Sequence, residues 1–238
     1  MRLKRYLLPR LAILLTACLL LSGIALRRHQ IATTSANQLD SAPTIIIDPG
    51  HGGFDGGAVV GEILEKDINL QIANRLAAML TAAGFQVIST RTDDSSTEVD
   101  PTATISARKK SDLAERLRLA KSHPKAIYIS IHLNKYPSAS CKGAQMFFAP
   151  RVPEAKQLAD CLRAGVVDLL QPENHRTVKA GTRDTYLLYY APIPAVIAEC
   201  GFMSNPAELE QLTTPAYQGE MAFALFRGII SYYMNTRT

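Results

Sequence analysis

The stretch IIIDPGHGG, residues 45–53, is an apolar run that leads directly into a glycine-rich turn containing one histidine. A short apolar run bounded by Pro and Gly is typical of a buried strand, and glycines permit the sharp turn that follows it. His51 is therefore predicted to lie at the exposed end of a strand. The order of the glycines matches neither the GxGxxG fingerprint nor a Walker motif, so the turn does not indicate a nucleotide site.

The rest of the sequence alternates between strand-like and helix-like patterns. Short apolar runs predict six strands, at residues 44–48, 85–90, 126–133, 143–149, 186–190 and 195–200. Helical spacing of apolar residues predicts helices within residues 68–80, 113–120, 155–166 and 217–233, whereas residues 92–110 are polar and expected to be irregular. Continuous apolar strands are typical of sheets covered on both faces. We therefore expect a single α/β domain with a mostly parallel, twisted central sheet of about six strands and helices on both faces.

Two histidines and two carboxylates lie at the ends of these predicted elements. His51 and His132 lie at the ends of two strands, Glu199 ends a third, and Glu65 precedes the first helix. Ligands gather at the carboxyl ends of parallel strands, so we expect these residues to share one site. His51, Glu65 and His132 would supply the three protein ligands of one catalytic zinc ion, although such donors also suit other divalent metals.

Glu199 is a charged residue at the end of an otherwise apolar run. Burial of a carboxylate is costly unless a partner compensates for it. A metal-bound water would be such a partner, and Glu199 could take its proton during attack on a carbonyl carbon. A salt bridge to Arg91 or Arg116 is the structural alternative. The pattern as a whole predicts a metal-dependent hydrolase.

Residues 1–28 have the pattern of a signal peptide or membrane anchor. Basic residues flank residues 11–26, which contain no charge. The length of this run lies between that of a signal h-region and that of a spanning helix, and a weak cleavage pattern favours an uncleaved anchor. A lipoprotein box ending at Cys18 is an alternative. The basic residues in front predict that the remainder lies outside the cytoplasm, either anchored to the membrane or secreted.

The basic charge of the chain is concentrated in this leading segment. The formal net charge is +5, but residues 1–30 contain six of the 26 lysines and arginines and none of the 21 acidic residues. The remainder is nearly neutral and has no basic stripe with aromatic residues, so we expect no nucleic-acid partner. We interpret residues 29–43 as a polar linker and residues 44–238 as the catalytic domain.

Three cysteines follow the leading segment. Cys141 and Cys161 could pair in an oxidising compartment. Cys200 lies in an apolar strand and is interpreted as a buried hydrophobic residue, because a catalytic thiol would need a positioned histidine.

Five motifs in this sequence, in this order, resemble those of the zinc-dependent N-acetylmuramoyl-L-alanine amidases of the amidase-3 type. They are IDPGHGG (47–53), EKDINL (65–70), TRTD (90–93), SIHLN (130–134) and ECGFMSN (199–205). The resemblance covers about residues 44–234. It implies a central sheet flanked by helices, zinc ligands at His51, Glu65 and His132, and a catalytic glutamate at Glu199.

The resemblance also implies the substrate and its cellular setting. Enzymes of this family cleave the amide between the lactyl group of N-acetylmuramic acid and L-alanine in peptidoglycan. The short chain, the apolar leading segment and the stretch GTRDTYLL, residues 181–188, are most similar to the CwlD-like germination amidases of the spore cortex. Those enzymes act on the way to muramic-δ-lactam. We expect the anchor or a protein partner to bring the enzyme to its polymer.

Two alternative functions are consistent with the same residues. A zinc peptidase would cut within the peptide stem and leave shortened stems on muramic acid. A catalytically silent module would bind peptidoglycan through the same pocket without turnover.

Overall fold

Six strands form the central sheet of the computed structural model, which describes residues 43–97, 100 and 102–236. The predicted signal or anchor, including Cys18, and nearly all of the predicted linker lie outside these residues. In spatial order the strands are β4 (Gln86–Ser89), β1 (Thr44–Pro49), β5 (Ile127–Asn134), β8 (Ala195–Phe202), β6 (Gln145–Phe148) and β7 (Lys179–Ala180). All neighbouring strands are parallel except β6 and β8. The predicted mostly parallel six-stranded sheet is confirmed.

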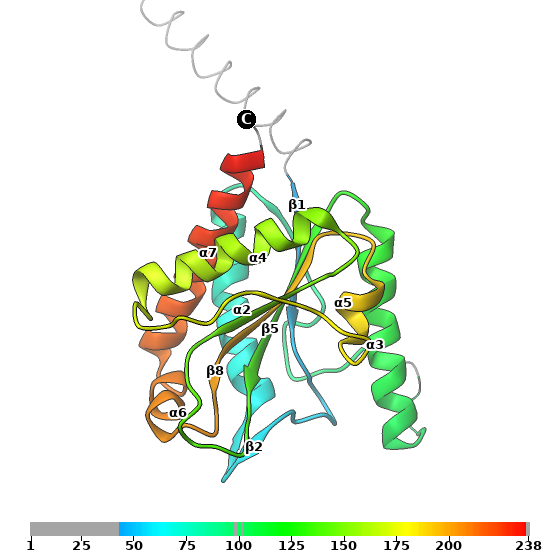
Figure 1. Cartoon of the computed structure of the whole chain (residues 1–238). Coiled ribbons are helices and arrows are strands. Elements are labelled where there is room, and N and C mark those ends of the chain that lie inside the picture. Colours follow the sequence, from blue (N-terminus) through cyan, green and yellow to red (C-terminus); the bar gives the residue numbers. More distant parts are fainter. Residues whose placement is uncertain (1–42, 98–99, 101, 237–238) are drawn as a thin grey trace, which may run out of the picture. The chain divides into compact units, whose positions relative to one another are not determined.

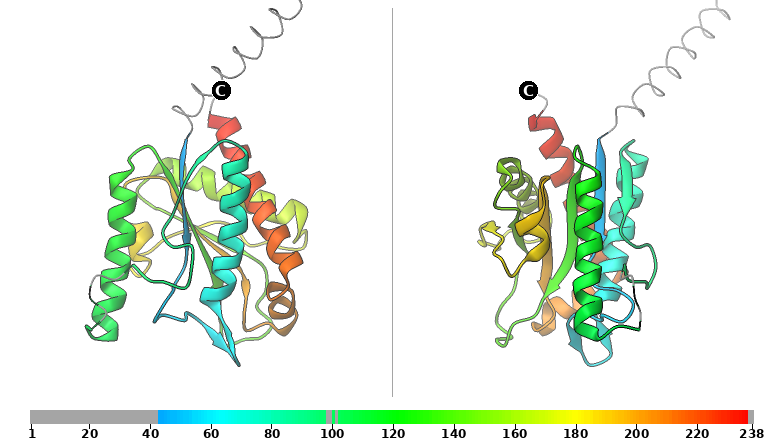
Figure 2. Two further views of the ribbon diagram at one scale, coloured as in Figure 1. Left: turned by 180° about the vertical axis from the view of Figure 1, so that it is seen from behind. Right: turned by 90° about the vertical axis from the view of Figure 1, so that its right-hand side faces the viewer.

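Helices cover both faces of this sheet. The first face packs against α2 (Glu65–Ala82), α4 (Pro153–Leu169) and α7 (Pro215–Thr236). The second face packs mainly against α3 (Ile105–Ser122) and α5 (Tyr186–Tyr190). The left panel of Figure 2 shows α2 and α7 side by side, and the right panel shows α3 in front of the sheet with α5 next to it.

The alternation of side chains along β1 explains how one strand serves both layers. Successive side chains of a strand point to opposite faces of its sheet. Ile45 and Ile47 belong to the core beneath α2, whereas Ile46 belongs to the core with Leu117 of α3. All three isoleucines are fully buried. This double burial is why the strand has a continuous rather than an alternating apolar sequence.

The prediction of a strand at residues 186–190 is wrong, because these residues form the helix α5. Leu187 and Leu188 are buried, whereas Tyr186 and Tyr190, four positions apart, are both exposed. That spacing matches one turn of a helix, but a run of five apolar residues is too short for periodicity to distinguish a helix from a strand. The sixth strand of the sheet is instead β7, with only two residues.

Three further features were not expected from the sequence, namely the early start of the predicted helix α3, a helix after β8 and a hairpin before α2. The helix α3 begins at Ile105, inside the segment predicted to be irregular, and the side chain of Thr104 caps it by accepting from Ala107 N at 3.3 Å. The helix α6 (Pro206–Leu212) follows β8. A small antiparallel hairpin, β2 (Val59–Val60) and β3 (Ile63–Leu64), precedes α2.

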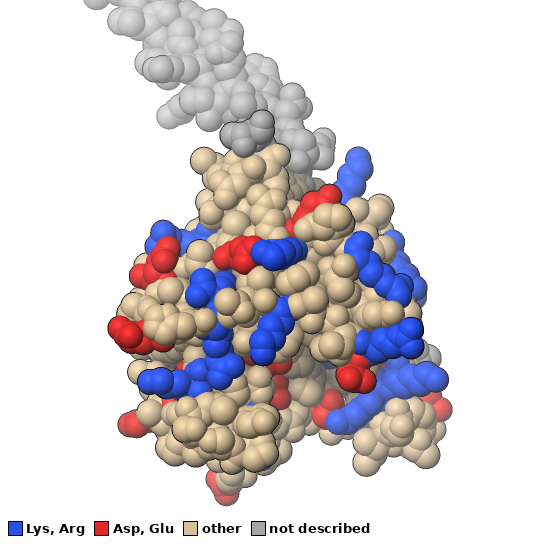
Figure 3. Space-filling view, viewed as in Figure 1, with Lys and Arg blue, Asp and Glu red and all other residues tan. Residues whose placement is uncertain are grey.

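The carboxyl ends of β1, β5 and β8 lie at one edge of the sheet, together with the β2–β3 hairpin and the start of α2 (Figure 1). The carboxyl edge of a parallel sheet is the usual place for a ligand site. Basic and acidic side chains are interspersed over the face shown in Figure 3. No helix in the described part of the chain is long and apolar enough to cross a membrane.

Candidate metal centre

His51 lies in the loop that follows β1 and has a left-handed backbone conformation, with φ at 62°. Its Nδ1 lies 2.9 Å from Oδ2 of Asp55, so the other ring nitrogen, Nε2, faces the interior of the site. A carboxylate on one imidazole nitrogen is the arrangement that commonly orients a histidine toward a metal. Asp55 was not singled out from the sequence, although it follows His51 by only four residues.

Glu65 is the first residue of α2 and its side chain is only 4 % exposed. Its Oε2 accepts a hydrogen bond from Ala58 N at 2.8 Å, and its Oε1 accepts one from Leu133 N at 3.0 Å. Asn69, one turn further along α2, also donates to Oε1 at 3.2 Å. These donors come from three segments and fix the carboxylate in one orientation.

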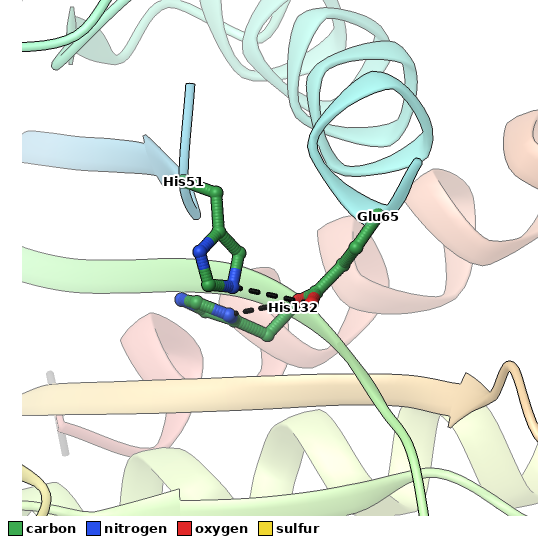
Figure 4. Close-up of side chains that lie close together, drawn as sticks. All are labelled: His51, Glu65 and His132. Atoms are coloured by element: carbon green, nitrogen blue, oxygen red, sulfur yellow. Dashed lines mark hydrogen bonds and ion pairs between the residues drawn. The ribbon is translucent and has the colours of Figure 1, made fainter. Parts of the chain in front are cut away.

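The three predicted ligands converge on one point, as Figure 4 shows. Nε2 of His51 lies 3.1 Å from Oε2 of Glu65, and Nδ1 of His132 lies 3.0 Å from Oε1 of the same carboxylate. The two imidazole rings meet edge to face, with centroids 4.9 Å apart. One ligand atom from each residue lies within 4.8 Å of the others. The sequence prediction that these residues meet agrees with this geometry.

The electrostatics of the cluster are those of a cation site. Burial raises the pKa of Glu65, but hydrogen bonds and charge interactions with His132 and His51 outweigh it and hold the pKa well below its usual range. Burial lowers the pKa of His51, but Asp55 and Glu65 together raise it to about 9. The carboxylate thus stays ionised and holds a proton on His51. A divalent cation would displace that proton, since metal binding requires a neutral imidazole.

Two glycines provide the room that this cluster needs. A Cβ on Gly50 would lie 2.2 Å from Nε2 of His132. A Cβ on Gly57 would lie 2.6 Å from both Oε2 of Glu65 and Cδ2 of His51, and φ at Gly57 is 70°. Glycine is therefore required at both positions for close approach, and at residue 57 also for the backbone conformation.

Two buried arginines hold the loop that carries His51. Nε of Arg91 donates to the carbonyl oxygens of Pro49 and His51 at 3.0 and 2.9 Å. Arg116 donates to His51 O at 2.9 Å and forms ion pairs with Asp48 and with Asp112. Both guanidinium groups therefore bind partners other than Glu199. The structural alternative for Glu199, a salt bridge to one of them, is not found among the described residues.

Glu199 lies on β8 directly opposite His132 of β5 in the parallel register. Side chains paired in this way project from the same face of a sheet, so Glu199 lies beside the cluster. Its Oε2 is buried and has no hydrogen-bond partner among the described residues. Burial raises its pKa to about 7, with His132 opposing and Glu65 adding to the shift. An unpartnered buried carboxylate next to possible metal ligands is suited to hold or release a proton.

The donor set fits a zinc ion. Two imidazoles and one carboxylate on a scaffold that orients them match the three-ligand sets of catalytic zinc sites, which leave a fourth position for water or substrate. The carboxylate that orients His51 and the amide donors that orient Glu65 provide the outer support that such sites need.

The cysteines take no part in this centre. Cys141, Cys161 and Cys200 are all free, so the possible pairing of Cys141 with Cys161 is not found. Cys200 is fully buried, and burial holds its pKa well above the usual range. This environment agrees with the interpretation of Cys200 as an apolar core residue.

A parallel sheet with titratable side chains converging at its carboxyl edge places the chain in the class of α/β enzymes. The family model for N-acetylmuramoyl-L-alanine amidases of the amidase-3 type matches residues 45–231, and the chain belongs to this family.

Individual relatives agree with the family. The germination-specific N-acetylmuramoyl-L-alanine amidase of Bacillus subtilis (strain 168) is 37 % identical over 195 residues, which are 81 % of each chain. The CwlD amidase of Clostridioides difficile, solved in complex with the GerS lipoprotein, is 36 % identical with a TM-score of 0.78, covering 81 % of this chain and 99 % of that one. An N-acetylmuramoyl-L-alanine amidase of Clostridium difficile 630 is 28 % identical with a TM-score of 0.70, covering 83 % and 99 %.

Proposed function

We propose that this amidase depends on one zinc ion bound by His51, Glu65 and His132, and that Glu199 is its catalytic base. The observation that carries the proposal is the convergence of the three ligand atoms within 4.8 Å of one another, with the unpartnered carboxylate of Glu199 on the adjoining strand. The bond cleaved joins the lactyl group of N-acetylmuramic acid to L-alanine in peptidoglycan.

Glu199 performs both proton transfers of the proposed reaction. Glu199 takes a proton from the attacking water and returns it to the departing amine of L-alanine, so that the peptide stem leaves and the glycan strand remains. Its buried Oε2 makes no hydrogen bond within the described residues that would have to break first. A zinc ion bound here would supply Lewis acidity toward the carbonyl oxygen and would favour ionisation of the water. Asp55 keeps Nε2 of His51 directed at the site.

The setting we infer is the spore cortex. The similarity to a germination-specific amidase and to the CwlD amidase supports a role on the way to muramic-δ-lactam. We infer that the catalytic domain acts outside the cytoplasm, delivered by residues 1–28 as signal or anchor. The solved CwlD amidase is in complex with a lipoprotein, which supports a protein partner for this chain as well.

The substitution Glu199→Gln tests the catalytic assignment. It preserves the shape of the side chain but removes the base, so kcat should fall by about two to four orders of magnitude. Zinc content should remain at one ion per chain, because Glu199 is not a proposed ligand. The control is Glu210→Gln, since Glu210 is exposed on α6 and has no role in the site. Near-native turnover of Glu199→Gln would refute the role of Glu199.

A further inference from the structure

A pocket of about 580 Å³ shares no lining residue with the metal centre and has no role in the chemistry described so far. Three segments form it, namely residues 140–143 before β6, residues 171–176 after α4, and Glu208 of α6. Residues 140–143 lie between β5 and β6, and α6 follows the carboxyl end of β8. The pocket therefore lies at the same edge of the sheet as His132 and Glu199.

The floor of the pocket is fixed by hydrogen bonds. Asn174 is buried and donates to Ala144 O at 2.9 Å, while Gln171 accepts from Ala144 N at 2.7 Å. Glu208 accepts from Gly143 N at 2.8 Å. Gly143 has φ at 88°, and a Cβ there would lie 2.9 Å from the Asn174 side chain. A ligand would thus meet a preformed floor and would lose little affinity to ordering it.

The rim of the pocket carries charges of both signs. The side chains of Lys142, Glu173 and His175 are exposed and make no hydrogen bond or ion pair with other described residues. Arg176 also lines the pocket, with its guanidinium 4.7 Å from the ring centre of Phe202 and its Nε donating to Lys142 O at 2.9 Å. The pocket suits a ligand that has both carboxylate and amino groups.

The register of the sheet relates the pocket to the strand that carries Glu199. Gln145 of β6 lies directly opposite Glu199 of β8, and Gly143 precedes Gln145 by two residues. The segment that lines the pocket therefore leads directly into the residue that pairs with Glu199. A stem whose cleaved amide lies at Glu199 could extend across β6 toward the pocket with its distal part.

We propose that this pocket binds the distal part of the peptide stem, around its third residue. The proposal rests on the amidase function above and adds a basis for selection by stem length. Free stems carry carboxylates and, at their diamino acid, an amino group. Lys142 would bind a carboxylate and Glu173 the amine, as charge-assisted pairs. The enzyme should then favour stems of three or more residues over dipeptide stems.

The test compares two free stem peptides by NMR titration of the zinc-loaded protein, which cannot hydrolyse them because they lack the lactyl amide. The tripeptide L-Ala-γ-D-Glu-meso-diaminopimelate should shift the signals of residues 140–143 and 171–176, whereas the dipeptide L-Ala-γ-D-Glu should not. Lys142→Glu should weaken the tripeptide about three- to fivefold, as expected for an exposed ion pair. The control, Lys125→Glu, changes an exposed lysine at the opposite edge of the sheet, before β5, and should have no effect.

A second variant tests the pocket by blocking it sterically instead of changing a charge. Ser140→Trp places a large side chain on the exposed rim and should reduce tripeptide affinity at least tenfold, and kcat/KM for tripeptide-stem substrates with it. Equal kcat/KM for dipeptide and tripeptide stems, in the unmodified protein and in Ser140→Trp, would overturn the pocket assignment. Tripeptide binding at the pocket without any hydrolysis of peptidoglycan would instead overturn the proposed function alone.

Discussion

At the scale of single residues, each proposed ligand is marked by the neighbouring groups that orient its side chain as well as by its residue type. His51 is oriented by Asp55, which also pairs with Lys109 at 2.9 Å. Glu65 is held by two backbone N–H groups. Sequence reasoning could single out the proposed ligands because they are histidine and glutamate at predicted strand and helix ends. It could not find Asp55 as a support, because an aspartate in a glycine-rich loop is also a common turn residue.

Removal of the Asp55 carboxylate should weaken metal binding without removing a ligand. In Asp55→Ala, His51 loses the acceptor on Nδ1, so its ring and tautomer are no longer fixed, and zinc affinity should fall about 10- to 100-fold. Competition with a chelator of known affinity measures this change. Asp184→Ala, at an exposed aspartate of the 181–185 loop, is the matched control. Unchanged zinc affinity in Asp55→Ala would show that Asp55 does not support the site.

Cys200 offers a contrasting prediction, since it is next to Glu199 in sequence but has no expected role in chemistry. Cys200→Ala should keep kcat and zinc content unchanged and should lower the free energy of unfolding by about 1 kcal/mol, because it leaves a small cavity in the core. Denaturant unfolding and turnover on the same sample check this. Loss of turnover in a folded Cys200→Ala protein would instead support the Cys200 thiol as a catalytic nucleophile.

At the scale of elements, the loop from β1 to the β2–β3 hairpin has to bring His51 and Glu65 together over a short stretch of chain. Gly57 lies at the point of closest approach. Gly57→Ala should cost about 1 kcal/mol for its left-handed backbone, and its Cβ should also displace Glu65 and His51, so zinc affinity should fall.

Gly61 separates these two effects. Its φ is also left-handed, at 59°, but a Cβ there would meet no atom within 4 Å. Gly61→Ala should therefore show a comparable loss of stability with unchanged zinc affinity. If both variants lost zinc equally, or neither did, close approach at residue 57 would not be what the site requires.

The elements also show where sequence patterns stop being informative. The long apolar runs of β1, β5 and β8 and the helical spacing of α2, α4 and α7 are strong local signals, and those elements are where they were expected. The short helix α5 was mistaken for a strand because tertiary packing of Leu187 and Leu188, rather than periodicity, decides its conformation. The strand β7 has only two residues and no local signal to detect.

At the scale of the whole molecule, the order of the strands brings residues that are far apart in sequence together into one site. β1, β5 and β8 are neighbours in the sheet although they are far apart in sequence. Sequence reasoning predicted a shared carboxyl edge, but it did not give the strand order. It considered Arg91 and Arg116 only as possible partners of Glu199. In the fold both bind backbone carbonyl groups of the loop after β1, and Arg116 also pairs with the carboxylates of Asp48 and Asp112.

The central claim is tested most directly by mass spectrometry of peptidoglycan digested by the metal-free protein with increasing amounts of zinc. We predict free peptide stems with intact L-alanine at their amino ends, with a rate that rises in proportion to zinc and reaches its plateau at one ion per chain. Shortened stems still attached to muramic acid, or the same release of stems with no metal added, would contradict the account.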